Sequence, residues 1–309
     1  MKNLLEINNV VKKYGDFTAL NDVSIHIPKG SVFGLLGPNG AGKTSLIRII
    51  NQITMPDSGS IILDGETLAL KHIADIGYLP EERGLYKSMK VGEQALYLAQ
   101  LKGLSKKEAK ERLKYWFDKF DIAAWWGKKI EELSKGMAQK VQFIVTVLHK
   151  PKLLIFDEPF SGFDPINAQL IAQEILQLRD EGATIIFSTH RMESVEEMCD
   201  EIALIDKSNK ILDGKLNDIK LQFRTNTFQV GLQTNNPKEI EQKLKQNFEV
   251  FPADFHLLND GLKLNVKLTQ GNSANDLLSF LTSRGEVQHF VEIIPNANDI
   301  FIQAIHKNK

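Results

Sequence analysis

Hydrophobic residues in the first two-thirds of the chain fall in short runs rich in Val, Ile and Leu, and these runs alternate with longer stretches of helical periodicity. Short apolar runs bounded by turn residues predict strands, and their alternation with helices predicts an α/β domain built in layers. The strands that we expect are Leu4–Lys13, Asp22–Ile27, Ser31–Leu36, Ser60–Leu63, Ile76–Tyr78, Lys152–Phe156, Thr184–Ser188 and Glu201–Asp206.

A different pattern occupies the middle of this region, where the strand-like runs are missing. The segments VGEQALYLAQLKG and SKKEAKERLKYWFDKF, and the stretch Ala138–Leu148, have the periodicity of helices. Ser105, with Glu108 three residues later, forms the capping-box pattern that begins a helix. We therefore expect a helical insertion at about residues 85–149 of the α/β core.

The composition changes after about Leu221, where Asn and Gln become frequent and Gly and Pro become rare. The expected elements are strand Thr227–Leu232, helix Pro237–Gln246, strand Phe248–His256, a turn at Asn259-Asp260-Gly261, strand Leu262–Leu268, helix Ala274–Ser283, strand Glu286–Ile294 and a terminal helix. This βαββαβ order is that of the ferredoxin-like fold. We therefore expect a first domain at 1–218 and a small α+β accessory domain at 219–309.

The overall composition is that of a globular protein, with 42% hydrophobic and 25% charged residues in 309. The formal charge of −1 gives no general basic excess of the kind that favours nucleic acid or anionic lipid. Cys199 is the single cysteine and forms no intrachain disulfide. The N-terminal residues lack the features of a signal peptide, and no apolar window approaches 18 residues. We expect a cytosolic protein that reaches a membrane only through a partner.

A phosphate-binding motif follows one of the expected strands. The sequence GPNGAGKT at 37–44 matches G-x-x-x-x-G-K-[ST], after the apolar run Val32–Leu36 and before the helical run Ser45–Asn51. Glycines let successive backbone N–H groups point at phosphate oxygens, and the helix N-terminus adds a positive partial charge. In such a loop Lys43 would reach the β and γ phosphates, and the Thr44 hydroxyl would coordinate Mg²⁺.

Two further apolar strands end in polar residues that suit phosphate chemistry. The strand after Pro151 ends in Asp157 and Glu158, and the strand beginning at Thr184 leads to His190. Ligands of α/β sheets collect at the carboxyl ends of strands, so these side chains would face the phosphate loop. Taken alone, the Asp-Glu pair is more simply a solvated turn and the histidine a structural residue. Beside a phosphate loop, Asp157 would hold Mg²⁺, Glu158 would polarise water, and His190 would donate to the γ-phosphate.

This ordered set of motifs resembles the ATP-binding cassette (ABC) family, specifically the nucleotide-binding subunit of an ABC transporter. The matching motifs are a Walker A sequence GPNGAGKT (37–44), a Q-loop-like YLPEE (78–82), a signature-like LSKGM (133–137), a Walker B sequence LLIFDEP (153–159), a D-loop SGFD (161–164) and a switch STH (188–190). The resemblance covers about residues 1–218. It implies a P-loop NTPase fold with a RecA-like core, a β-subdomain and a helical insertion.

The resemblance also implies roles for individual residues. The ATP-binding residues would be Tyr14, Gly37, Pro38, Asn39, Gly40, Ala41, Gly42, Lys43, Thr44 and Ser45, with the Tyr14 ring stacked on adenine. Mg²⁺ would be bound by Thr44, Asp157 and Glu81; Glu158 would act as general base and His190 would stabilise the attack. Ser134, Lys135 and Gly136 would reach the ATP of a second subunit, and Asp164 would serve in the D-loop. Ser134 would also cap a helix that begins near Met137, which would point the helix N-terminus at that phosphate.

The implied assembly is a dimer with a second copy or a related ATPase subunit, head to tail around two ATP molecules. ATP binding would close the dimer and hydrolysis would open it, driving a separate integral-membrane permease. No nucleic-acid partner is expected. The alternatives are a soluble ABC ATPase of DNA repair or translation, and a regulatory sensor that binds ATP without hydrolysing it.

Two motifs depart from the common family pattern. Glu81 stands at the Q-loop position where glutamine is usual, which adds negative charge near the triphosphate. The signature reads LSKGM in place of the commoner LSGGQ, so Lys135 replaces a glycine and Met137 a glutamine. The GYLPEERGLY and LSKG variants resemble a subgroup of ABC-2-type exporters and sodium-export ATPases that often carries an added C-terminal domain. Export is therefore the expected direction.

Overall fold

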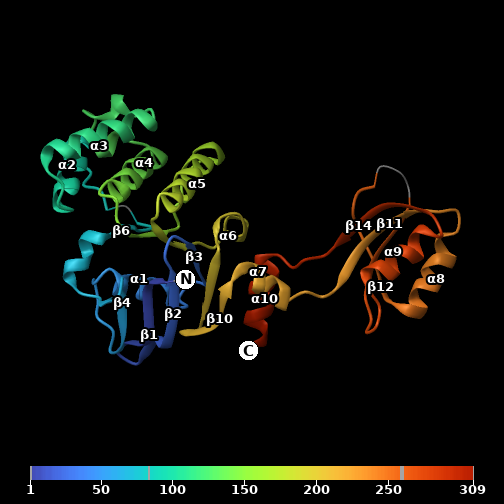
Figure 1. The fold of residues 1–309 in the computed structure, drawn as a ribbon. Helices are drawn as coiled ribbons and strands as arrows, with labels where there is room; N and C mark the ends of the chain where they lie inside the picture. The colour runs from blue at the N-terminus through green and yellow to red at the C-terminus, as the bar shows by residue number, and fades with distance from the viewer. Residues whose placement is uncertain (1, 83, 258–260, 309) are drawn as a thin grey trace. The chain divides into compact units, whose positions relative to one another are not determined.

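The computed structural model describes residues 2–82, 84–257 and 261–308. The chain divides into two compact units, one of residues 1–216 with 301–309 and one of residues 217–300 (Figure 1). The limits expected for the two domains, 1–218 and 219–309, remain predictions. The last residues of the chain group with the first unit.

A six-stranded sheet of order β10-β9-β3-β8-β7-β6 forms the centre of the first unit. Its strands are β3 (Val32–Leu36), β6 (Ile76–Leu79), β7 (Leu153–Asp157), β8 (Thr184–Ser188), β9 (Glu201–Asp206) and β10 (Asn209–Lys215). Only β10 runs antiparallel to its neighbour. Every residue of β3, β7 and β8 is buried, as expected of parallel strands that are covered on both faces. Their carboxyl ends, which carry the candidate residues, therefore meet at one edge.

A second sheet of order β2-β1-β4-β5 packs its apolar face into the same core. It consists of β1 (Asn3–Tyr14), β2 (Phe17–Pro28), β4 (Ser58–Leu63) and β5 (Glu66–Thr67), all antiparallel. Helix α1 (Lys43–Ile50) buries Leu46, Ile47, Ile49 and Ile50 in this core. The β-subdomain therefore fixes the helix that follows the phosphate loop.

The helical insertion is found where the periodicity predicts it. It contains α2 (Val91–Leu101), α3 (Lys106–Lys119) and α4 (Lys135–Val147), which lie together in Figure 1, with the short 3-10 turns η2 (Ala123–Trp125) and η3 (Ile130–Glu132). The capping box of Ser105 and Glu108 is confirmed at the start of α3. The insertion is joined to the core through aromatic packing: the rings of Phe143 on α4 and Phe156 on β7 stack at 5.6 Å.

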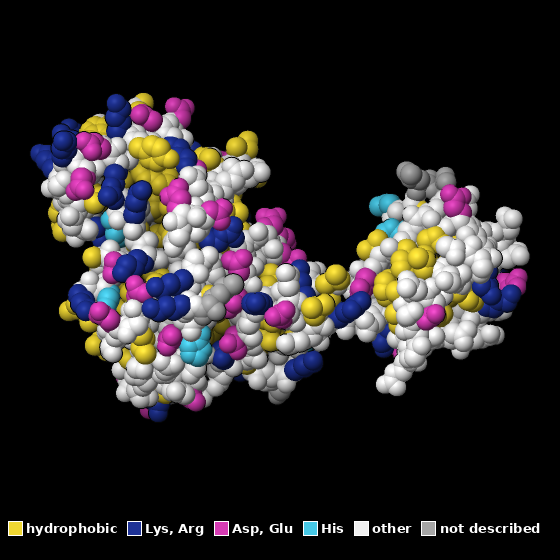
Figure 2. All heavy atoms as spheres, viewed as in Figure 1, with side chains coloured by type: hydrophobic (Ala, Val, Ile, Leu, Met, Phe, Trp, Pro, Cys, Tyr) yellow, Lys and Arg dark blue, Asp and Glu magenta, His cyan; other side chains and the backbone are white. Residues whose placement is uncertain are grey.

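The remaining elements of the first unit are η1 (Leu70–Asp75), α5 (Pro165–Asp180), α6 (Met192–Met198) and α7 (Leu216–Gln222), the last running into the second unit. Cys199 is buried, as a small apolar residue would be. No helix in the described part of the chain combines the length and apolar character needed to span a membrane. Acidic and basic side chains are interspersed on the face shown in Figure 2, in keeping with the balanced charge.

The second unit has the ferredoxin-like topology predicted from its element order. It contains β11 (Thr227–Gln233), α8 (Pro237–Asn247), β12 (Glu249–Pro252), β13 (Leu262–Lys267), α9 (Ala274–Thr282) and β14 (Glu286–Glu292). Helix α10 (Ala297–Lys307) follows β14, and its residues from Phe301 onward group with the first unit. The antiparallel sheet has the order β12-β13-β11-β14. The strand expected at Phe248–His256 is shorter, because its pairing with β13 ends at Pro252. Of the expected turn, Asn259 and Asp260 lie outside the described residues.

Candidate nucleotide-binding site

The phosphate loop lies between β3 and α1, and two of its glycines are required by close backbone contacts. A Cβ atom on Gly37 would lie 2.2 Å from the carbonyl oxygen of Ile205, and one on Gly42 would lie 2.3 Å from that of Ala19. Both glycines also have positive φ angles, 149° and 118°. No side chain caps α1, and its first turn has no acidic residue. Its N-terminal N–H groups and dipole therefore favour an anion such as phosphate.

The other residues of the loop make a tight turn. The Ala41 N–H donates to the carbonyl of Pro38 at 3.2 Å, and Gly40 has a φ of 78°. Ala41 is buried, whereas Asn39, Gly40 and Thr44 are exposed and Ser45 is half-buried. The exposed residues leave the outer side of the loop open to a ligand.

Lys43 curls back over the loop that it follows. Its Nζ donates to the carbonyls of Gly37 at 2.6 Å and Pro38 at 3.1 Å. Burial lowers the pKa of Lys43, and the charges of Asp157 and Glu158 oppose this effect. The lysine therefore lies within electrostatic range of both carboxylates while its head contacts the loop where phosphate oxygens are expected.

Asp157 ends β7 as a buried carboxylate, with 7% of its surface exposed. Burial raises the pKa of Asp157, and the charges of Glu81 and Glu158 add to the rise. Burial, with a smaller contribution from Asp157, also raises the pKa of Tyr78 to about 12. These acids repel one another, so the arrangement favours a cation among them.

The same residues fit a magnesium ion bound together with a nucleotide. No group of three His, Cys, Asp or Glu side chains in the described ranges forms a metal site by itself. Mg²⁺ does not need one, because it usually takes one or two carboxylates, with substrate phosphates and water completing its octahedron. The Thr44 hydroxyl and the Asp157 carboxylate are the donor types that this arrangement uses.

Glu158 and His190 meet at the strand edge, as the ends of β7 and β8 predict. Oε1 of Glu158 accepts a hydrogen bond from the backbone N–H of His190 at 2.8 Å. The same oxygen lies 2.8 Å from Nδ1 of the His190 ring. Oε2 accepts from the Thr189 hydroxyl at 3.2 Å. Thr189 lies within the STH motif at 188–190, but the sequence pattern gives it no role of its own; its position beside a strand-end histidine is the signal that indicates one. The imidazole is exposed, with 77% of the side chain accessible.

The backbone at Glu158 is held in an unusual conformation. Its φ of 49° is left-handed, which is uncommon for a residue with a side chain. The Glu158 N–H donates to the Ser188 carbonyl at 2.8 Å. Such backbone strain costs of order 1 kcal/mol and is often found at functional sites, where it aims a side chain. The residue with this conformation is the one whose carboxylate contacts His190.

The signature residues begin α4, which starts at Lys135 rather than at the expected Ala138. The side chain of Ser134 accepts a hydrogen bond from the Met137 N–H at 3.2 Å, so the predicted cap is confirmed. Ser134 and Lys135 are exposed and Gly136 is half-buried. In the described chain, no hydrogen bond or ion pair joins these residues to the phosphate loop.

Asp164 begins α5. Its Oδ1 accepts a hydrogen bond from the Asn167 N–H at 2.9 Å, and hydrogen bonds from Asn167 keep the pKa of Asp164 below its usual value. Tyr14 lies at the end of β1, paired with Phe17, and is 45% exposed. Its ring contacts Lys12, whose Nζ lies 5.4 Å from the centroid. No contact found among the described residues joins Tyr14 to the phosphate loop.

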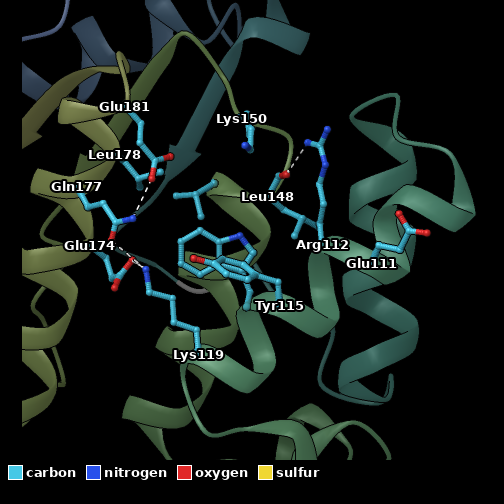
Figure 3. Close-up of a pocket in the computed structure, with 12 residues that line it drawn as sticks. Glu111, Arg112, Tyr115, Lys119, Leu148, Lys150, Glu174, Gln177, Leu178 and Glu181 are labelled. Atoms are coloured by element: carbon cyan, nitrogen blue, oxygen red, sulfur yellow. Dashed lines mark hydrogen bonds and ion pairs between the residues drawn. The ribbon is translucent and has the colours of Figure 1, made fainter.

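A separate cavity of about 430 Å³ lies between α3, the end of α4 and α5 (Figure 3). Trp116 and Leu148 supply apolar walls, and Lys119 bonds Glu174 at 2.7 Å across it. None of its lining residues belongs to the expected ATP-binding set. This cavity is therefore distinct from the candidate nucleotide site.

Comparisons with known proteins give matches along most of the chain. A family model described as ABC transporter matches residues 20–161, one described as AAA domain, putative AbiEii toxin, Type IV TA system, matches residues 127–196, and one described as ATP-binding protein DrrA1-3-like, C-terminal domain, matches residues 214–305. The uncharacterized ABC transporter ATP-binding protein YhaQ of Bacillus subtilis is 39% identical over 302 residues, which is 98% of each chain. The linearmycin resistance ATP-binding protein LnrL of the same organism is 36% identical over 70% of each chain.

A solved structure gives the same fold. The chain matches the structure titled "Structure of ATP binding subunit of ABC transporter" with a TM-score of 0.67 and 32% identity, over 71% of this chain and 93% of that one. The cassette-like architecture of the first unit is therefore shared with a solved relative.

Proposed function

The chain belongs to the ABC transporter family of ATP-binding proteins, and we propose that it binds and hydrolyses ATP to drive a separate membrane permease. The observation that carries the proposal is the contact of Glu158 with His190 beside the phosphate loop. A nucleotide sensor without turnover would need neither a poised carboxylate nor a histidine there. The arrangement therefore favours hydrolysis over mere binding.

The chemistry follows from the positions of the side chains. The N-terminus of α1 and Lys43 would bind the phosphates, and Tyr14 would stack on the adenine. Glu158 would accept a proton from the attacking water, while His190 would donate a hydrogen bond to the γ-phosphate and hold the water in line. Attack would break the bond between the γ-phosphorus and the bridging oxygen and release ADP and phosphate.

Mg²⁺ would be held by Thr44 and Asp157, and when bound it would neutralise charge on the phosphates. We place Glu81 in the outer part of this site, where its carboxylate would accept hydrogen bonds from water on the ion. Because Glu81 adds a negative charge where glutamine is usual, dependence on Mg²⁺ should be steep.

We propose that the active form is a dimer, with a second copy of the chain or a related ATPase subunit. Ser134, Lys135 and Gly136 lie at or near the surface at the start of α4, and no contact in the described chain joins them to its own phosphate loop. A helix N-terminus with exposed N–H groups suits phosphate. In a head-to-tail pair the helix N-terminus that these residues form would face the ATP of the other subunit.

We further propose that the transport direction is export and that the protein works at the cytoplasmic face of the membrane through its permease. One relative is named a linearmycin resistance protein, and resistance to a compound is one outcome of its export. Another, SrtF of Streptococcus pyogenes, is named a lantibiotic transport ATP-binding protein and is 34% identical over 210 residues. The ferredoxin-like unit would support the dimer or regulate the ATPase.

The experiment is an affinity purification of the tagged protein from detergent-solubilised membranes of its host, followed by mass spectrometry and an ATPase assay of the complex. A stoichiometric polytopic partner that stimulates phosphate release supports the proposal. Recovery of ribosomal or DNA-associated proteins alone would favour the soluble ABC class instead. ATP binding with no phosphate release, with or without a membrane partner, would favour the sensor.

A further inference from the structure

The side chain of Lys135 lies across the glycine of the D-loop in the same chain. A Cβ atom on Gly162 would lie 2.5 Å from Cε of Lys135, 2.6 Å from its Cδ and 2.8 Å from its Cγ. The methylene stem therefore fills the space that a side chain at position 162 would need. The φ of Gly162 is 87°, a left-handed backbone conformation that favours glycine. The Nζ of Lys135 lies 3.4 Å from the Ser161 hydroxyl.

Ionic attraction does not explain this position. Lys135 is the first residue of α4, after the cap Ser134, and the first turn contains no acidic residue. A cation at a helix N-terminus faces the positive end of the dipole, which costs about 0.3–1 kcal/mol. No salt bridge to Lys135 is found among the residues that the structure describes. Packing of the stem on Gly162, with the head in contact with Ser161, therefore accounts for the arrangement.

The D-loop is in turn bonded to the turn that carries Glu158. The Ser161 N–H donates to the Glu158 carbonyl at 3.0 Å. Gly136 also lies against the loop, since a Cβ there would be 3.3 Å from the Gly162 carbonyl oxygen. Only two contacts therefore separate Lys135 from the left-handed residue Glu158.

We propose that Lys135 is a positioning residue that ties the signature helix α4 to the D-loop and thereby holds the turn of Glu158. The effect of this contact on hydrolysis rests on the proposed function, in which the signature helix of a dimer would face the ATP of the other subunit. A shift of α4 on binding that ATP would then be transmitted through Lys135 to the Glu158 of its own subunit.

Hydrogen exchange of the full-length protein without nucleotide tests the contact directly. K135A removes the stem and keeps helix propensity, K135M keeps the stem and removes the charge, and K106A is the matched control. Lys106 is likewise the first residue of a helix, α3, after a serine cap. In K135A the Ser161 amide should exchange at least about threefold faster, since its local opening becomes easier. K135M should recover most of the protection, and K106A should exchange as the wild type does.

Steady-state ATP hydrolysis adds a second readout. A positioning role predicts that kcat changes while KM for ATP changes little, which a purely structural role does not predict. K135A should lower kcat about tenfold, with KM for ATP changed much less, because a displaced group loses transition-state geometry rather than ground-state binding. K135M should recover a large part of kcat. The proposal is overturned if K135A leaves the Ser161 exchange rate unchanged, or if K135M is as slow as K135A, since the cation would then act directly on phosphate. If the wild type itself hydrolyses no ATP, the proposed function fails, while the exchange result still decides the role of Lys135.

Discussion

Replacement of Glu158 by glutamine removes a proton acceptor while leaving its hydrogen bonds nearly intact. The carboxylate accepts from the His190 N–H, the His190 ring and the Thr189 hydroxyl. In E158Q the amide oxygen can face His190, and the amide NH₂ can donate to the Thr189 hydroxyl, which accepts as readily as it donates. The side chain should therefore keep its place.

The substitution should have a small effect on the free energy of unfolding and a large effect on the rate of hydrolysis, so the two effects can be measured separately. Hydrogen bonds to a charged group contribute about 1.5–3 kcal/mol and neutral ones about 0.5–1.5, so the free energy of unfolding should fall by only about 1–2 kcal/mol. Loss of a general base lowers the rate about 10²–10⁴-fold, which is about 3–5 kcal/mol on the barrier. The rate of ATP hydrolysis should therefore fall by about a hundredfold or more, while the protein remains folded.

The assay measures phosphate release at saturating Mg-ATP, the affinity for a fluorescent ATP analogue, and the oligomeric state by sedimentation. E158Q should bind the analogue within about threefold of the wild type, a difference under 1 kcal/mol, and should accumulate as an ATP-bound dimer. E181Q is the control, because Glu181 lies at the end of α5 and bonds only Gln177 among the described contacts of its side chain. Turnover of E158Q close to that of the wild type would remove Glu158 from the mechanism.

Three further predictions concern stability and domain organisation. G37A should destabilise the protein by at least about 2 kcal/mol in urea unfolding, because its Cβ would collide with the Ile205 carbonyl at a positive φ; an unchanged midpoint would contradict the loop geometry. Burial lowers the pKa of His149 to about 4. In the unfolded state the same imidazole has a pKa of about 6.5 and binds a proton at a higher pH than in the folded state. The free energy of unfolding should therefore fall by up to about 3 kcal/mol as the pH drops from about 6.5 to about 4. H149Q should flatten that part of the profile, and an equal pH dependence in the variant would assign it to other groups. A chain ending at Leu221 should bind the ATP analogue within about threefold of the wild type, yet melt at a lower temperature, because residues 301–309 group with the first unit; loss of binding by a truncated chain that is still folded would contradict the proposed domain limits.

The comparison of sequence and structure separates local from long-range information. The phosphate loop could be predicted because its strand, glycines, lysine and helix are contiguous, so one segment of chain contains the whole geometry. The caps of Ser105 and Ser134 are equally local, since each bonds an N–H three residues away. The ferredoxin-like order was predictable because strand and helix periodicities directly encode which faces are buried.

Tertiary structure alone decided which distant residues meet. Periodicity shows that β3, β7 and β8 are buried but not that β8 lies between the other two, and this order is what places His190 beside Glu158. The need for glycine at position 37 comes from a carbonyl of β9, far along the chain. The crossing of Lys135 over Gly162 and the grouping of the last residues with the first unit likewise depend on contacts between separate segments. A sequence pattern records which side of an element is apolar, whereas the neighbour on that side is selected by packing of the whole chain.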